Sequence, residues 1–400
     1  MTRIRLTGAR VVLPDTVLED GDVTVADGVI TGVGVPSRPG DGDHTEGAWC
    51  HADTVDLDGH WLTPGFVDMH VHGGGGASYT AGDADEALRA VAFHRAHGTT
   101  TTVASLITAT PGQLLDSVAA LAGLVEDGIL AGLHLEGPYL SHARCGAHDP
   151  ALLRAPDTVE TDALVRVARG TIRMMTLAPE LPGALDLVRR LADTGVVAAI
   201  GHTDGSHGHT LAALDAGASV ATHLFNAMRG IHHRDPGPIT ALLHDSGAVV
   251  EIINDKVHLH RGIVNLTYQA AGAARVALVT DAISAAGMPD GTYALGPVNT
   301  RVHGGIARLV DSDTIAGSTL TLDRALRTAV HENRLPITDA VRSLTATPAA
   351  ALGLSDTIGT IEEGKRADFV VLDPDLRVTA VMHHGRWVRD NAARDIRDHR

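Results

Sequence analysis

The chain has 400 residues, of which 44% are hydrophobic, enough for one large barrel domain or two smaller domains. Its 32 Lys and Arg against 48 Asp and Glu give a net charge of −16, which argues against a general nucleic-acid or anionic-membrane surface. Only Cys50 and Cys145 are present, without a Cys-x-x-Cys spacing, so neither a disulfide framework nor a thiolate zinc site is indicated. No stretch is apolar for long enough to cross a membrane or to serve as a leader, so we expect a cytoplasmic protein.

Residues 1–61 are predicted to form short β-strands broken by turns, because β-branched residues alternate there with Gly and Asp. The Pro-, Gly- and Asp-rich residues 35–48 are predicted to be a loop. The β-type pattern returns at residues 359–388. Since neither end alone makes a convincing sheet, we predict one small β-domain built from both termini, residues 1–61 plus 355–400.

Residues 62–354 alternate between strand and helix patterns, which indicates a parallel sheet. Amphipathic segments separate near-continuous apolar runs of the kind that have both faces buried. The predicted strands are Leu62–His72, Thr99–Thr108, Leu130–Pro138, Arg173–Glu180, Val196–Thr203, Ser219–Asn226, Val249–Asp255 and Val276–Ala282. Eight such units favour a (β/α)8 TIM barrel, an α/β fold, over a doubly wound open sheet.

The first predicted strand ends with two histidines on one face, His70 and His72, which suit a divalent metal as a first pair of ligands. In a barrel, chemistry sits at the carboxyl ends of the strands. Four later strand ends also carry potential ligands or acid–base groups, namely Glu136, His202, His223 and Asp281. Such residues on five strands are hard to assign to structure alone. Imidazoles with a glutamate favour Zn²⁺ or Fe²⁺ over Mg²⁺, which prefers oxygen ligands.

The attacking group is predicted to be a metal-bound hydroxide, because the chain has no Gly-x-Ser-x-Gly elbow and no convincing Cys–His pair. Asp281 ends the last predicted strand and is the candidate general base and acid, taking a proton from the water and passing it to the leaving group. An alternative role as the N-cap of a following helix is compatible with both functions.

Several motifs together resemble the amidohydrolase superfamily, and within it the deacetylases of N-acetylglucosamine 6-phosphate. They are Thr63–Gly73, His134–Leu140, the Gly-His-Thr at 201–203, Thr222–Met228, Val279–Ala282 and the closing residues 359–371. The resemblance covers essentially the whole chain. It implies a barrel joined to a small β-sandwich made from both termini, a homodimer, and hydrolysis of the N-acetyl group to give D-glucosamine 6-phosphate and acetate. The galactosamine epimer, or a different amide, is the alternative substrate.

The resemblance also implies the metal ligands. Glu136, His202 and His223 would hold the principal metal, and His70 with His72 would be able to hold a second. One or two divalent metals per subunit are therefore expected, with Zn²⁺ ahead of Fe²⁺.

The substrate contacts implied by the resemblance lie in three regions of the chain. Asn226 and the backbone of Ala227 would bind the sugar phosphate, helped by Arg234 reaching across from the partner subunit. Further sugar and carbonyl contacts would come from Ala147, His148, His258 and Ile315. The family often has a lysine-bearing Lys-Lys-Gly-Ala-His where this chain reads Ala-Arg-Cys-Gly-Ala-His over residues 143–148, so the loop over the sugar differs here. No nucleic acid or membrane partner is expected.

Overall fold

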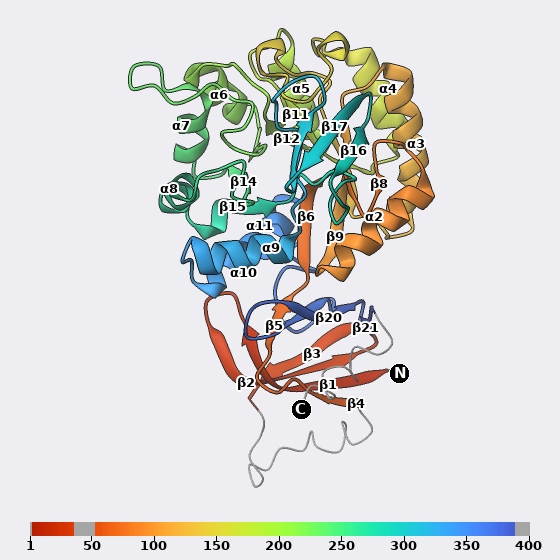
Figure 1. The fold of residues 1–400 in the computed structure, drawn as a ribbon, viewed down its shortest axis with the longest axis vertical. Coiled ribbons are helices and arrows are strands. Elements are labelled where there is room, and N and C mark those ends of the chain that lie inside the picture. The colour runs from red at the N-terminus through yellow and green to blue at the C-terminus, as the bar shows by residue number, and fades with distance from the viewer. Residues whose placement is uncertain (1, 36–52, 389–400) are drawn as a thin grey trace.

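The computed structural model describes residues 2–35 and 53–388, so nearly all of the predicted loop at 35–48 lies outside the described residues. A barrel occupies one end of the molecule and a smaller sheet the other (Figure 1). In the part of the chain that is described, none of the helices is both long and apolar enough to cross a bilayer.

The smaller sheet takes strands from both ends of the chain. Antiparallel pairing of β19 with β5 joins the two ends, and the strand order is β21-β20-β19-β5-β1-β2-β3, with β4 beside β1. Alternate side chains of these strands enclose a core of their own. The strands are β1 (Arg3–Val12), β2 (Val17–Ala26), β3 (Val29–Gly34), β4 (Asp53–Asp56), β5 (Trp61–Pro64), β19 (Phe369–Leu372), β20 (Val378–His383) and β21 (Arg386–Trp387). The exact domain boundaries stay a prediction.

The larger sheet contains all eight predicted barrel strands, each parallel to its neighbours in chain order, which confirms the (β/α)8 barrel. Nearly every residue of these strands is buried, as the apolar runs predicted. The strands are β6 (Phe66–Val71), β9 (Thr99–Ile107), β10 (Gly132–Glu136), β11 (Ile172–Leu177), β12 (Val197–Ile200), β13 (Val220–Ala221), β14 (Val249–Ile253) and β15 (Val276–Val279).

The prediction of one continuous strand over Leu62–His72 was wrong. The run is divided at Gly65: β5 pairs with β1 and β19 of the smaller sheet, and β6 pairs with β9 of the barrel. A Cβ at Gly65 would lie 2.1 Å from Oγ1 of Thr100, so the crossing point requires a glycine. The run therefore links the two parts of the molecule before it reaches the histidines.

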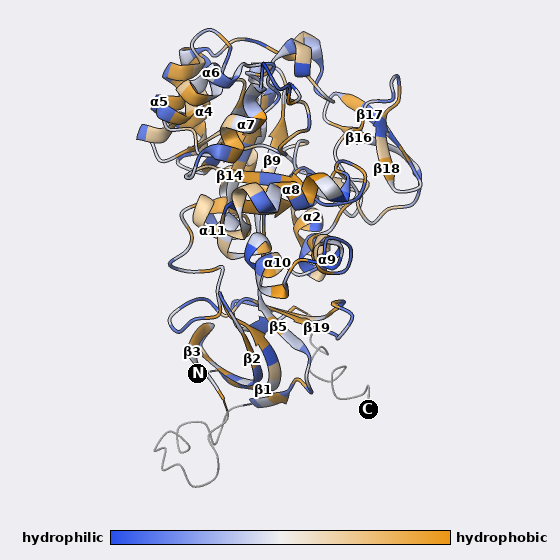
Figure 2. Ribbon diagram, turned by 90° about the vertical axis from the view of Figure 1, so that its left-hand side faces the viewer, coloured by the Kyte–Doolittle hydropathy of each residue, from blue (hydrophilic) through white to orange (hydrophobic). Residues whose placement is uncertain are grey.

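Helices surround the barrel sheet (Figures 1 and 2). Some of them are capped at their start by a side chain. Thr110 accepts from the backbone N–H of Gln113 at the start of α3, and Asp157 accepts from the backbone N–H of Glu160 in α4. The helices are α2 (Ala84–Ala96), α3 (Pro111–Glu126), α4 (Thr158–Ala168), α5 (Ala184–Asp193), α6 (His207–Asp215), α7 (Gly237–His244), α8 (Arg261–Ala271), α9 (Leu322–Arg327), α10 (Ile337–Leu344) and α11 (Ala346–Ala351).

An antiparallel three-stranded sheet follows the last barrel strand and was not predicted. It consists of β16 (Gly291–Leu295), β17 (Val298–His303) and β18 (Ile306–Leu309), and it projects from the barrel (Figure 2). A small core that includes Ile283 and Leu295 packs it onto the segment after β15. The insertion is thereby placed at the mouth of the barrel. A two-residue hairpin, β7 (Gly73–Gly74) and β8 (Ala77–Ser78), follows β6.

The barrel has a seam between its first and last strands. Among the described strands, no ladder of backbone bonds pairs β6 with β15. Instead the buried carboxylate of Asp68 accepts from the backbone N–H of Thr280 at 3.3 Å and from its hydroxyl at 2.6 Å. The N–H of Asp281 also donates to the carbonyl of His70 at 2.9 Å. The Asp68 side chain therefore helps to hold β6 and β15 together, where strand pairing does so elsewhere in the barrel.

Candidate active site

A pocket of about 460 Å³ opens at the carboxyl ends of the barrel strands. The polar side chains predicted from the strand ends converge on it, and each of them is buried: His70, His72, Glu136, His202, His223 and Asp281. The strands thus bring together residues that are more than 200 positions apart in the sequence, as the closure of a ring requires.

One group of donors is centred on Glu136 at the end of β10. Its Oε1 lies 3.1 Å from Nε2 of His202 and 3.0 Å from Nε2 of His223, and the two imidazole nitrogens are 3.1 Å apart. His148 also belongs here, with its Nε2 3.4 Å from Oε2 of Glu136. All three ligands predicted for a principal metal therefore face one point.

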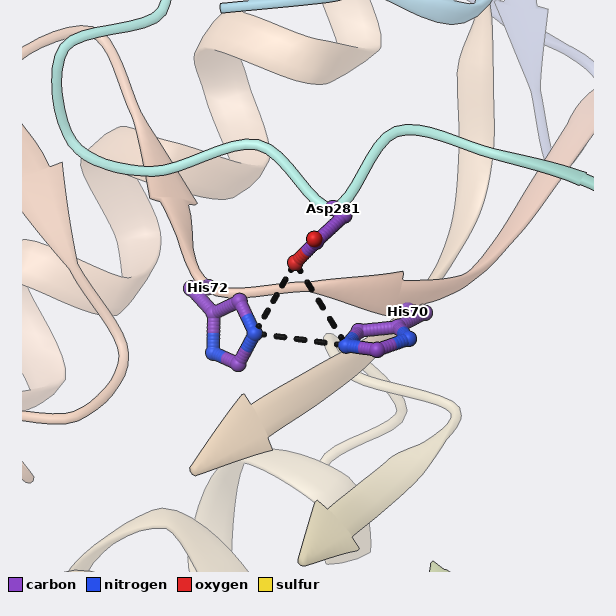
Figure 3. A group of neighbouring side chains, drawn as sticks. All are labelled: His70, His72 and Asp281. Atoms are coloured by element: carbon purple, nitrogen blue, oxygen red, sulfur yellow. Dashed lines mark hydrogen bonds and ion pairs between the residues drawn. The ribbon is translucent and has the colours of Figure 1, made fainter. Parts of the chain in front are cut away.

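A second group lies beside the first and contains His70, His72 and Asp281 (Figure 3). Nε2 of His70 and Nε2 of His72 are 3.3 Å apart, and Oδ1 of Asp281 lies 3.1 Å from Nε2 of His72. Oε2 of Glu136 is also 3.1 Å from Nε2 of His72. The Glu136 carboxylate therefore stands between the two groups and can reach either.

Three site residues have a left-handed backbone, with φ of 46° at His202, 28° at His223 and 48° at Asp281. Such a conformation costs a non-glycine residue about 1–3 kcal/mol, so neighbouring contacts must hold it. The carbonyl of Asp281 accepts from the N–H of Ser318 at 2.8 Å, and Gly317 packs so closely that a Cβ there would lie 2.9 Å from the same carbonyl. The strain turns each side chain from its strand end toward the pocket.

Both carboxylates of the site are held ionised. Burial alone would raise the pKa of Asp281, but the positive charge of His70 and a hydrogen bond from His72 outweigh it and lower the pKa to about 2. Burial likewise opposes ionisation of Glu136, and its histidine neighbours, His70 first, hold its pKa well below the ordinary value. Burial lowers the pKa of His148 to about 4, so this imidazole is neutral near pH 7.

Glu251 supports the site from beneath and was missed by the sequence analysis. This fully buried residue of β14 places Oε2 3.0 Å from Nδ1 of His70 and accepts from the backbone N–H of His223 at 3.1 Å. When His70 is neutral and holds a metal, this carboxylate would keep the ring proton on Nδ1, so that Nε2 would offer its lone pair to the pocket. The available signal was a single charged residue in the apolar run Val249–Ile253.

The predicted substrate residues of this chain line the same pocket, apart from Arg234: Ala147, His148, Asn226, Ala227, His258 and Ile315. His258 is oriented by Asp255, whose Oδ2 lies 2.8 Å from its Nδ1. Nδ1 of His148 lies 2.9 Å from the hydroxyl of Thr108. Each of these imidazoles therefore keeps Nε2 for the pocket.

Arg234 lies elsewhere. It is exposed, and its Nη1 lies 2.7 Å from Nε2 of its neighbour His233. Among the described residues, the arginines that line this chain's own pocket are Arg144 and Arg308, and neither was predicted to be a site residue. Arg308 comes from β18 of the inserted sheet, which explains why a barrel pattern alone could not locate it.

The donor set fits a divalent metal. Four imidazole nitrogens and two carboxylates point at a common buried space, and His72, Glu136, His202, His223 and Asp281 also face the pocket. Nitrogen-rich sets of this kind are typical of zinc or iron rather than of magnesium.

A sequence profile of the Amidohydrolase family matches residues 61–388, which is most of the chain. The chain belongs to the amidohydrolase family. This confirms the resemblance read from the motifs.

Within the family, the chain is similar to deacetylases of N-acetylated amino-sugar phosphates. The chain is 34% identical over 392 residues to N-acetylgalactosamine-6-phosphate deacetylase of Escherichia coli, covering 96% of this chain and 99% of that one. It is 34% identical over 387 residues to N-acetylglucosamine-6-phosphate deacetylase of Bacillus subtilis, covering 94% of each.

Among solved structures, a mutant of N-acetyl-D-glucosamine-6-phosphate deacetylase from Mycobacterium smegmatis, in complex with N-acetyl-D-glucosamine-6-phosphate, is 46% identical. It superposes with a TM-score of 0.91 over 97% of this chain and 100% of that one. The similarity therefore extends through both the barrel and the smaller sheet built from both ends of the chain, which we call the terminal sheet.

Proposed function

We propose that this protein is a metal-dependent hydrolase that removes the N-acetyl group of N-acetyl-D-glucosamine 6-phosphate, giving D-glucosamine 6-phosphate and acetate. The observation that carries the proposal is the convergence of Glu136, Asp281 and three histidines on one pocket, with His70 directly beside them, in a chain 46% identical to an enzyme solved with that sugar phosphate. The fold alone would not suffice, because barrels of this kind support many reactions.

Glu136, His202 and His223 would hold the principal metal, with His70 and His72 able to hold a second. A bound divalent metal supplies a Lewis acid that polarises the amide carbonyl and lowers the pKa of water. Zn²⁺ is our first choice and Fe²⁺ the second, since both accept imidazole with carboxylate. Glu136 has an oxygen directed at each group of histidines, so it suits either one or two metals.

Asp281 would move the proton. Its ionised carboxylate faces the pocket beside the ligands and is free to accept a proton from the attacking water. The protonated carboxyl group can then donate to the amide nitrogen as the bond to the acetyl carbon breaks, so the sugar leaves as a neutral amine. The lowered pKa keeps Asp281 ionised, and therefore able to accept a proton, at neutral pH.

The sugar phosphate would be held at the opposite side of the pocket from the scissile amide. Asn226 and the backbone of Ala227 would bind the phosphate, and His148 and His258 would contact the sugar and the carbonyl. Arg234 would complete the site across a homodimer interface, consistent with its exposure and its absence from the lining of its own chain's pocket. A guanidinium is the fork-shaped donor that suits phosphate.

The galactosamine epimer is the weaker candidate. The chain is 46% identical to the solved glucosamine enzyme and 34% identical to the relative with the galactosamine name. The two sugars differ only in the orientation of one hydroxyl group, so an assay on both substrates must decide between them.

Acetate release should be measured on N-acetylglucosamine 6-phosphate, its galactosamine epimer and unphosphorylated N-acetylglucosamine, with metal analysis of the same protein. We expect turnover to be fastest on the first and to disappear with chelation. The proposal fails if none of the three releases acetate from metal-loaded protein, or if the phosphate makes no difference to kcat/KM.

A further inference from the structure

A second pocket, of about 750 Å³, lies where the barrel meets the terminal sheet. Helix α2 ends directly above β20 and β21 (Figure 1), and it contributes Arg95. The terminal sheet contributes Arg366, the β20–β21 turn with His383, His384 and Arg386, and the β2–β3 turn with Asp27. None of its lining residues belongs to the pocket described above.

The lining of this junction pocket is cationic. Arg366 is paired with Asp368, its Nε donating to Oδ2 at 2.6 Å. Within the described residues, the side chains of Arg95 and Arg386 have neither a hydrogen bond nor an ion pair, and Nε of Arg95 is buried without an acceptor. Three arginines thus stand against the two carboxylates of Asp27 and Asp368.

The pKa shifts of two residues that line the junction pocket, His384 and Arg95, agree with an excess of positive charge there. Burial lowers the pKa of His384, and the charge of Arg366 lowers it further. Burial lowers the pKa of Arg95, the charge of Asp368 acts in the opposite direction, and the charge of Arg366 lowers the pKa further. A partly desolvated guanidinium without a hydrogen-bonded acceptor is costly, and a bound anion would relieve that cost. Such a concentration of positive charge stands out in a chain with a net charge of −16.

A divalent cation is the competing occupant, because Asp368, His383 and His384 have ligand atoms within 4.8 Å of one another. The contacts argue against it. Asp368 already binds the guanidinium of Arg366 and accepts the N–H of His384 at 2.7 Å, so its oxygens are engaged. A cation placed there would also lie beside the unpaired Arg95.

We propose that the junction pocket binds a phosphate dianion, either free or as the monoester of a small metabolite, through Arg95 and Arg386. Two unpaired guanidinium groups match the charge of one dianion, and their paired N–H donors match its oxygens. The lining also includes the ring of Trp387, which can receive the body of a monoester. The site is separate from the catalytic pocket and does not depend on which sugar that pocket takes.

The test is calorimetric titration of the full chain with inorganic phosphate at constant ionic strength. Arg95→Gln and Arg386→Gln should each weaken one class of phosphate binding by about 10- to 150-fold, the loss typical of a charge-assisted contact. The control is Arg301→Gln, which removes the same charge from an exposed position on β17 and should leave binding unchanged. Acetate release by Arg95→Gln should keep its wild-type kcat and KM. Repeating the titration with glucose 6-phosphate distinguishes a monoester site from a site for free phosphate.

Thermal unfolding provides a second measurement, because phosphate should raise the Tm of wild type and Arg301→Gln by more than it raises that of Arg95→Gln. Equal phosphate binding by wild type and both junction variants would overturn the proposal. Two results together would also overturn it: a zinc ion that wild type binds and His384→Asn does not, and phosphate binding that is unchanged in Arg95→Gln. The pocket would then be a cation site. If Arg95→Gln unfolds earlier than wild type in the absence of phosphate, and binds phosphate as wild type does, Arg95 serves the fold instead.

Discussion

Replacing Glu251 tests whether this buried carboxylate supports the candidate metal ligands His70 and His223 by accepting their hydrogen bonds. Its carboxylate is fully buried, and one oxygen serves both Nδ1 of His70 and the N–H of His223. Glu251→Ala leaves those two donors buried without an acceptor, and breaking a buried hydrogen-bonded pair in this way costs about 3–5 kcal/mol. Glu251→Gln keeps the shape, and its amide oxygen can accept from both donors. It loses the charge assistance, about 1 kcal/mol, and it places the amide nitrogen where the buried Oε1 has no hydrogen-bond partner.

The assay is urea unfolding of metal-free protein at neutral pH, with metal content measured separately. We expect the free energy of unfolding to fall in the order wild type, Glu251→Gln, Glu251→Ala. Metal bound through His70 should weaken by about 10- to 100-fold in the alanine variant, as is usual when the residue that orients a ligand is removed. Equal stability of the alanine variant and wild type, or equal losses in both variants, would refute the reasoning.

Four further predictions concern the site and its neighbourhood. Asp281→Asn should keep the metal while kcat falls by about 10³-fold or more, and near-normal turnover would disprove the proton-transfer role. Glu136→Gln should abolish activity and weaken the principal metal, whereas His70→Asn should remove at most a second one; metal analysis giving the reverse would invert the ranking. Arg234→Ala should raise KM for the phosphorylated sugar by about 10- to 150-fold and barely change the rate on the unphosphorylated sugar. Equal losses on both would mean a structural role. Burial lowers the pKa of His94 from 6.5 to about 4, so its contribution is complete above pH 6.5 and is lost as the pH falls toward 4. Wild type should lose up to ~3 kcal/mol relative to His94→Gln over that range, and parallel unfolding profiles would contradict this.

The barrel strands could be predicted from sequence because burial on both faces leaves a direct record, a short apolar run bounded by turns. The candidate metal ligands could be singled out because they stand at the ends of those runs. The sequence of a strand does not show which other strand it pairs with. Nothing within Leu62–His72 shows that Trp61–Pro64 pairs with Phe369–Leu372 while Phe66–Val71 pairs with Thr99–Ile107.

Residues that act from outside the strand ends were also hidden. Arg308 reaches the pocket only because the inserted sheet folds back over the barrel mouth, a tertiary arrangement that no local period encodes. Glu251 had a local signal, but an isolated charge in an apolar strand says that a partner exists without saying which. Arg95 and Arg386 line the same pocket only through the docking of α2 on the terminal sheet.

The seam of the barrel coincides with the candidate catalytic groups, and this bears on how activity would arise during refolding. His70 and His72 lie on one side of the seam and Asp281 on the other, and the Asp68–Thr280 contact that closes it spans 212 residues. Closing a loop of that length costs about 5 kcal/mol of chain entropy, so the contact is among the last that a folding chain gains. A barrel that is otherwise assembled but still open at this edge would show its full helical signal and no turnover. Recovery of acetate release after dilution from urea should therefore lag behind recovery of circular dichroism.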